Sequence, residues 1–203
     1  MARLTVRRFA VYVFAALLPL ALSGQARAGL LSCGSTSEPF APWQDTTNYV
    51  LAPNGNAEAG TTNWTLTGGA KVVSGNETFY VHGTGESHSI LIPAGGTATM
   101  NSACVSLLSF WTRFFARNTG AAAAPLKIRL VYKGLLGNVV GILDVNGDEY
   151  AGHAWAPVKR QLMSGGVLAP LTATSVQVRL SVPAGSGGAF QVDDLFVDPW
   201  ALR

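Results

Sequence analysis

Short runs of apolar or alternating residues, separated by Gly, Pro and Asn, recur along the chain after Asn54. Runs of this kind, bounded by turn-forming residues, are typical of β-strands. No stretch shows a sustained helical period, so the pattern predicts an all-β fold in which two antiparallel sheets form a sandwich. The clearest expected strands lie at 71–74, 78–81, 89–92, 109–117, 126–133, 139–145, 176–182 and 190–197.

The first 28 residues have the parts of an export signal: three arginines, an apolar run over residues 9–22, and a small-x-small cleavage motif over residues 26–28. The apolar run is shorter than the roughly 20 residues that a membrane-spanning helix needs. We therefore predict cleavage before Gly29 and a secreted protein, whether periplasmic, extracellular or on the cell surface, with no stable membrane anchor. The predicted organisation is a signal peptide at 1–28, an N-terminal lead at 29–47 and one β-sandwich domain at 48–203.

Charge gives no reason to expect a nucleic-acid partner. Four of the 14 basic residues lie in the predicted signal and none of the 11 acidic ones does, so ten basic residues remain. The mature chain then has a net charge of −1. The sequence pI of about 9.1 reflects the precursor rather than a basic surface.

Cysteine usage agrees with export. The chain has two cysteines, Cys33 and Cys104, and an oxidising compartment allows them to pair. We predict a disulfide between them, with two buried free thiols as the alternative.

Arginines alternate with aromatic residues on one face of the strand expected at 109–117. Trp111 and Arg113 share that face with Phe115 and Arg117, whereas Phe114 lies on the other. In later strands, Arg129 and Arg179 occupy the polar face. If these strands share a sheet, the four arginines line a groove that grips an acidic group by bidentate hydrogen bonds; the alternative is a set of solvated outer faces.

Aromatic side chains suggest a glycan ligand, because sugar C–H faces stack on indole and phenol rings. Trp111 and Tyr150 are the preferred contacts. With the four arginines, they complete the predicted ligand-binding set.

Two motifs resemble the first and last strands of galactose-binding-like jelly-roll modules, the fold of many carbohydrate-binding modules of secreted bacterial proteins. They are NGNAEAGTTNWTLTGG at 54–69 and GGAFQVDDLFVDPW at 187–200. The resemblance covers about residues 48 to 198, and it implies a two-sheet antiparallel jelly-roll β-sandwich. It also implies that Trp64 and Trp155 belong to the core.

The same resemblance implies one structural calcium ion near the two motifs, with Glu58 and Asp193 as ligands. Hard oxygen ligands suit calcium. The alternative is that both carboxylates accept hydrogen bonds from the backbone and hold no ion. Ala57 stands where the family usually has Phe, so the opening segment departs from the pattern.

Catalytic motifs are missing from the sequence: it has no GxSxG, Walker loop, HExxH or CxxC. The leading hypothesis is therefore a secreted, non-catalytic module that binds a glycan or an envelope component. A structural or protein-interaction β-sandwich is the first alternative. A lyase acting on an acidic polysaccharide is the second.

Overall fold

The computed structural model describes residues 34–104, 111–121, 124–145, 152–162 and 173–198. Apart from the short 3₁₀ helix η2 (Ala41–Trp43), the elements are strands. No helix in these ranges is long and apolar enough to cross a membrane. The strands are β1 (Val50–Leu51), β2 (Trp64–Thr67), β3 (Lys71–Ser74), β4 (His88–Pro93), β5 (Thr97–Cys104), β6 (Trp111–Asn118), β7 (Lys127–Lys133), β8 (Val139–Asp144), β9 (Ala156–Pro157), β10 (Gln161–Leu162), β11 (Ser175–Ser181) and β12 (Ala189–Asp198).

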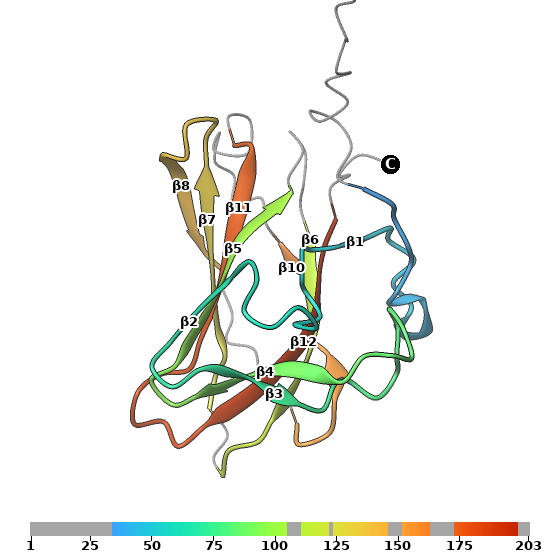
Figure 1. Cartoon of the computed structure of the whole chain (residues 1–203), viewed down its shortest axis with the longest axis vertical. Helices are drawn as coiled ribbons and strands as arrows, with labels where there is room; N and C mark the ends of the chain where they lie inside the picture. The colour runs from blue at the N-terminus through green and yellow to red at the C-terminus, as the bar shows by residue number, and fades with distance from the viewer. Residues whose placement is uncertain (1–33, 105–110, 122–123, 146–151, 163–172, 199–203) are drawn as a thin grey trace, which may run out of the picture.

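The strands form two antiparallel sheets that pack face to face (Figure 1). One sheet has the order β10-β6-β12-β4-β3, with β1 added beside β12 and β9 beside β6. The other sheet has the order β2-β5-β11-β7-β8. The prediction of an all-β, two-sheet antiparallel sandwich is confirmed.

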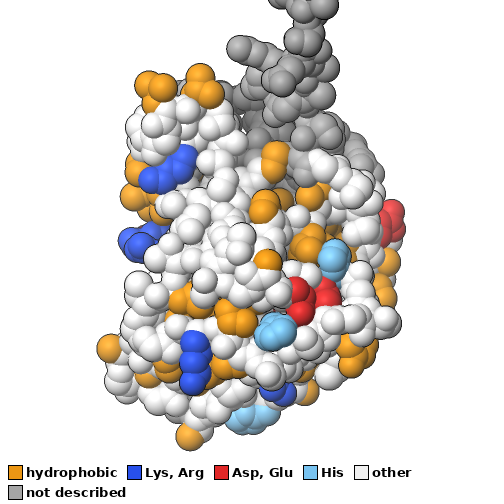
Figure 2. All heavy atoms as spheres, viewed as in Figure 1, with side chains coloured by type: hydrophobic (Ala, Val, Ile, Leu, Met, Phe, Trp, Pro, Cys, Tyr) orange, Lys and Arg blue, Asp and Glu red, His pale blue; other side chains and the backbone are white. Residues whose placement is uncertain are grey.

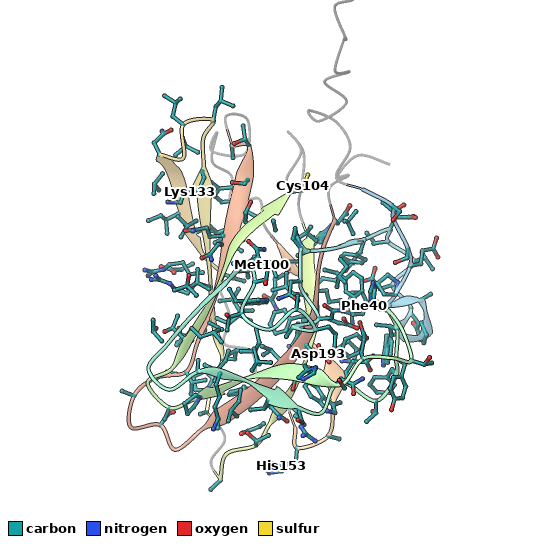
Figure 3. The ribbon with its side chains drawn as sticks, in the orientation of Figure 1. Phe40, Met100, Cys104, Lys133, His153 and Asp193 are labelled. Carbon is teal, nitrogen blue, oxygen red and sulfur yellow. The ribbon has the colours of Figure 1, made fainter. Side chains whose placement is uncertain are left out.

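Alternation along the strands builds the main core between the sheets. Met100 of β5, Leu130 of β7 and Val178 of β11 face Phe114 of β6 and Phe190 of β12, and all five are fully buried. Met100 lies between the two layers in Figure 3. Trp64 joins this core, as expected, and its indole N–H donates to the carbonyl of Asn54 at 2.8 Å.

A second apolar cluster covers the outer side of the seven-stranded sheet. Phe115 and Phe196 point away from the main core and pack with Phe40, Tyr49 and Trp155. The Phe40 ring stacks on Phe115 at 5.3 Å and meets the edge of Phe196 at 5.5 Å. Residues predicted as an N-terminal lead therefore close one face of the sandwich, and Figure 3 places Phe40 on the far side of β12 from Met100.

The two motifs at the ends of the domain are joined by the backbone. The N–H of Ala52 donates to the carbonyl of Leu195 at 2.9 Å, and the N–H of Leu195 donates to the carbonyl of Gly55 at 3.2 Å. A Cβ at Gly55 would lie 2.5 Å from the Leu195 oxygen, so this close approach requires glycine.

The strand expected at 78–81 is wrong, and β5 was not predicted. Glu77 turns its carboxylate back onto the backbone N–H groups of Phe79 and Val81, which satisfies locally the donors that a strand would offer to a neighbour. The segment is a loop between β3 and β4. β5 consists mainly of small and polar residues, so its alternation of Ala98 and Met100 with threonines gave a weak signal.

Replacing Phe40 tests whether the predicted lead is part of the folded domain. The Phe40 ring is fully buried, so we expect Phe40→Ala to lower the free energy of unfolding by about 3–5 kcal/mol. Tyr80→Ala is the control, because the Tyr80 side chain is 47% exposed. Urea titration measures both variants; equal stabilities would show that the 34–49 segment is not integral to the fold.

Candidate functional site

A row of polar side chains crosses the outer face of the five-stranded sheet. Thr65 of β2 pairs with Thr99 of β5, which pairs with Arg179 of β11. Arg179 pairs with Arg129 of β7, and Arg129 pairs with Asp144 of β8. Directly opposed residues in adjacent strands point to the same side of a sheet, so the five side chains form a continuous line.

Contacts within this row fix the two arginines. The Arg129 guanidinium donates to both carboxylate oxygens of Asp144, at 2.5 and 3.0 Å. This ion pair raises the pKa of Arg129 and lowers the pKa of Asp144. Arg179 Nε donates to the Thr99 hydroxyl at 3.4 Å. Both guanidinium groups are held in place and keep further N–H donors for a ligand.

Further cations and small apolar side chains surround the row. Lys127 and Lys133 point to the same outer side of β7 as Arg129. With Arg179, the described strands therefore place four cationic side chains and one acidic side chain, Asp144, on this face. Lys and Arg side chains emerge on the side of the molecule where Figure 1 places β7 and β8 (Figure 2). Val131 and Ile142 pair beside the row, and Ile142 is exposed.

The single groove predicted for four arginines does not form, because the strands that carry them divide between the sheets. Arg113 and Arg117 lie on β6 of the seven-stranded sheet, whereas Arg129 and Arg179 lie on the other sheet. Strands β6 and β7 follow one another in the chain but belong to different layers, which alternation cannot reveal.

Arg113 is buried rather than available to a ligand. Its guanidinium pairs with Asp45 at 2.8 Å, and its Nε donates to the carbonyl of Val158 at 2.7 Å. It also lies 4.6 Å from the centre of the Phe40 ring. Arg113 therefore ties the 34–49 segment to the sheet.

Arg117 and Trp111 lie at the border of the second cluster. Arg117 Nε donates to Gln191 Oε1 at 2.6 Å, and its guanidinium lies 5.0 Å from the Trp155 ring. Trp111 is half-buried against the cluster, with the Arg160 guanidinium 4.8 Å from its ring. Ligand contact by Trp111 stays a prediction, and Tyr150 lies outside the described residues.

The predicted calcium ligands have their carboxylate oxygens engaged. Glu58 Oε1 accepts from the N–H groups of Ser87 and His88 at 2.6 and 2.7 Å, and its Oε2 lies 2.9 Å from His88 Nδ1. Asp193 accepts from the N–H groups of Glu77 and Asp194 at 2.8 and 2.9 Å. This geometry matches the hydrogen-bonded alternative. Calcium binding by Glu58 and Asp193 stays a prediction.

A different group beside Asp193 offers ligand atoms. His82 and Glu86 of the β3–β4 loop and Asp194 of β12 place one such atom each within 4.8 Å of the others. Burial raises the pKa of Asp193 to about 8 and that of Asp194 to about 9. This group was not predicted from the sequence, although Asp194 follows Asp193 directly and His82 and Glu86 are four residues apart.

A pocket of about 470 Å³ adjoins the group. Its walls come from residues 34–37, β1, the β3–β4 loop and β12, and His82 lines it. Figure 2 shows histidine side chains beside acidic ones on this face of the molecule.

The disulfide stays a prediction. Cys104 ends β5 (Figure 3), and Cys33 lies outside the described residues, as does the predicted signal.

Comparison with solved structures identifies the fold. The xylan-binding domain CBM22-1 of Paenibacillus barcinonensis Xyn10C aligns with a TM-score of 0.50 and 18% identity, covering 75% of this chain and 94% of that domain. TmCBM61, solved with β-1,4-galactotriose, gives a TM-score of 0.44 and 17% identity, covering 71% and 94%. The enzymatically active domain of the bacteriophage CBA120 tailspike protein 4 gives 0.49 and 15%, covering 71% of this chain and 20% of that one. No family model and no curated protein matches the sequence.

The chain therefore has the jelly-roll β-sandwich fold of carbohydrate-binding modules. The fold that the two motifs implied is confirmed. At this identity the likeness describes the fold alone, since one fold hosts many functions.

The Asp45–Arg113 pair should make stability depend on pH. Burial opposes ionisation of Asp45, but hydrogen bonds from Thr47, Tyr49 and Arg113 outweigh it and hold the pKa of Asp45 below its usual 3.8. The stabilisation is therefore present at neutral pH and is lost as the pH falls through the folded-state pKa. Asp45→Asn should lower the free energy of unfolding at neutral pH by about 3–5 kcal/mol, because it leaves Arg113 buried without its partner.

Urea titrations of both proteins at neutral and acidic pH measure this effect. The difference between wild type and Asp45→Asn should shrink below pH 3.8, where protonation removes the charge of Asp45 in the wild type. A difference that does not change with pH would contradict the ion pair.

Proposed function

We propose that this protein is an exported module that binds a glycan, without catalysis, on the outer face of its five-stranded sheet. The polar row from Thr65 to Asp144 is the observation that carries the proposal. The jelly-roll fold of carbohydrate-binding modules supports it as an analogy of architecture.

The chemistry of the face suits a chain of sugars. A glycan presents hydroxyl groups at short intervals, and the row offers guanidinium donors, a carboxylate acceptor and threonine hydroxyls at the spacing of adjacent strands, about 4.8 Å. Val131 and Ile142 offer apolar contact to sugar C–H groups. The excess of cations favours a glycan that carries carboxylate groups.

Binding without catalysis agrees with where the histidines lie. A lyase would need a proton acceptor beside the arginines that neutralise the uronate. His88 belongs to β4, His82 to the preceding loop, and His153 lies against the carbonyl of Asn118 at the end of β6. All three border the seven-stranded sheet rather than the face that carries Arg129 and Arg179.

Arg129→Ala and Arg179→Ala test the proposed face. We expect affinity electrophoresis in polygalacturonate, soluble xylan and β-1,4-galactan to show retardation in at least one of them, strongest in polygalacturonate. Each variant should bind about tenfold more weakly, because a hydrogen bond to a charged group contributes about 1.5–3 kcal/mol and about 1.4 kcal/mol is a factor of ten. Added salt should reduce binding to polygalacturonate.

Lys71→Ala provides the matched control, since Lys71 is an exposed cation on β3 of the other sheet. Its binding should equal that of the wild type, and all three variants should melt at nearly the same temperature. If no glycan retards the protein, or if Lys71→Ala loses as much binding as the arginine variants, the proposed face is rejected.

A structural or protein-interaction role is the second candidate, and the β7–β8 hairpin favours it. Leu135 and Leu136 in its turn are 85% and 92% exposed, and Val139 and Ile142 on the edge strand β8 are also exposed. Exposed apolar groups on an edge strand suit pairing with another polypeptide. Leu135→Ser/Leu136→Ser should then abolish a partner interaction while leaving glycan binding unchanged.

A further inference from the structure

Four acidic side chains from distant parts of the chain meet under the β3–β4 loop. Glu77 and Glu86 come from the loop, and Asp193 and Asp194 come from the middle of β12. Glu77 and Asp194 are fully buried, Asp193 is 3% exposed, and the Glu86 side chain is 6% exposed. An ionised carboxylate out of contact with water requires a positive or N–H partner.

Two of these carboxylates have their partners. Glu77 accepts from the backbone N–H groups of Phe79 and Val81. Asp193 accepts from the N–H groups of Glu77 and Asp194. Hydrogen bonds from the backbone therefore satisfy the carboxylates of Glu77 and Asp193.

Glu86 is satisfied at one oxygen only, since its Oε1 accepts from Asn56 Nδ2 at 2.7 Å. Both carboxylate oxygens of Asp194, and Oε2 of Glu86, are buried without a hydrogen-bond partner among the residues that the structure describes. Asp194 lies where the pairing of β12 with β6 shifts register, and its φ of 48° is unusual for a residue other than glycine. The chain thus adopts a strained backbone at a carboxylate that meets no hydrogen-bond donor in the described part of the protein.

His82 faces this open side of the cluster. Its Nδ1 lies 2.6 Å from Glu86 Oε1, and the ligand atoms of His82, Glu86 and Asp194 all lie within 4.8 Å of one another. Atoms bound to one zinc ion at about 2.0–2.2 Å lie at most ~4.4 Å apart, so small side-chain rotations bring the three to a common ion. His82 has room to rotate because its side chain is 46% exposed.

We propose that His82, Glu86 and Asp194 bind one divalent metal cation and that the imidazole ligand makes the site prefer zinc to calcium. Imidazole nitrogen suits zinc and other transition metals, whereas calcium takes oxygen ligands. The set differs from the calcium pair implied by the family resemblance, because the carboxylates of Glu58 and Asp193 already accept N–H bonds. The ion links the β3–β4 loop to the central strand.

His82 lines the pocket, so an ion that enters it can reach the imidazole. Three protein ligands leave a coordination position for water or for a ligand group. This proposal is independent of glycan binding on the five-stranded sheet.

Zinc titration of chelator-treated protein tests the site, with isothermal calorimetry for affinity and thermal melting for stability. We expect one zinc ion per chain and a melting temperature that rises with zinc concentration, because the ion binds the native state. Calcium at the same concentrations should raise the melting temperature less.

His82→Ala and Asp194→Asn should each weaken zinc binding by more than the about 10–100-fold that follows loss of a hydrogen-bond partner to a metal ligand. Metal-free Asp194→Asn should melt at nearly the temperature of the wild type, because the buried carboxyl group that it replaces has no hydrogen-bond partner among the described residues to lose. His153→Ala and Glu58→Gln are the controls, and both should keep the zinc affinity of the wild type.

Three results would overturn the proposal. The first is the absence of a zinc response. The second is a zinc affinity that Asp194→Asn leaves unchanged while lowering the melting temperature of the metal-free protein, since that is the behaviour of a structural residue. The third is calcium binding that Glu58→Gln abolishes, without zinc binding, which would place the family's calcium site here instead.

Discussion

Two adjacent carboxylates in the middle of β12 constrain the rest of this fold. β12 is buried along nearly all of its length and pairs with β1, β4 and β6. Asp193 and Asp194 therefore lie in the interior, where each carboxyl group needs a hydrogen-bond or charged partner. The β3–β4 loop supplies that environment: the N–H of Glu77 binds Asp193, and Glu77 in turn holds the backbone of its own loop. A cation bound to Asp194 would complete this arrangement, because it would give the two buried oxygens the partner that the described residues do not supply.

The two sheets differ in what lies on their outer faces: aromatic residues cover the seven-stranded sheet, and a polar row crosses the five-stranded sheet. Phe40, Phe115 and Phe196 build a second cluster over the seven-stranded sheet, and the Asp45–Arg113 ion pair anchors the segment that covers it. The five-stranded sheet has no such cover in the described chain, and its outer face presents the row of hydroxyl, guanidinium and carboxylate groups. Arg129 of this sheet is therefore accessible to a ligand, with a side chain that is 46% exposed, whereas Arg113 of the other sheet is buried.

Strand positions were predictable where branched apolar residues alternate with polar ones. The strand expected at 176–182 is β11, Ser175–Ser181, and the one at 190–197 lies within β12. β5 was not predicted because its inward-facing residues are mostly small. The expected strand at 78–81 is a loop because the Glu77 carboxylate accepts hydrogen bonds from its backbone N–H groups. Alternation within a strand shows which side of the sheet each residue faces, but it does not show which of the two sheets the strand joins. The sequence therefore could not reveal that Arg113 and Arg117 lie on a different sheet from Arg129 and Arg179. Asp194 was not predicted as a ligand because the β3–β4 loop that covers its carboxyl group lies more than a hundred residues away in sequence.

The proposed site balances the buried carboxylate of Asp194 with a bound cation rather than with protein donors. A crystal structure of zinc-loaded protein, with diffraction recorded on both sides of the zinc absorption edge, tests it directly. We expect one anomalous peak between His82, Glu86 and Asp194, within about 2.0–2.3 Å of a ligand atom of each. Zinc bound elsewhere, with no peak there and with Asp194 hydrogen-bonded to protein, would contradict it.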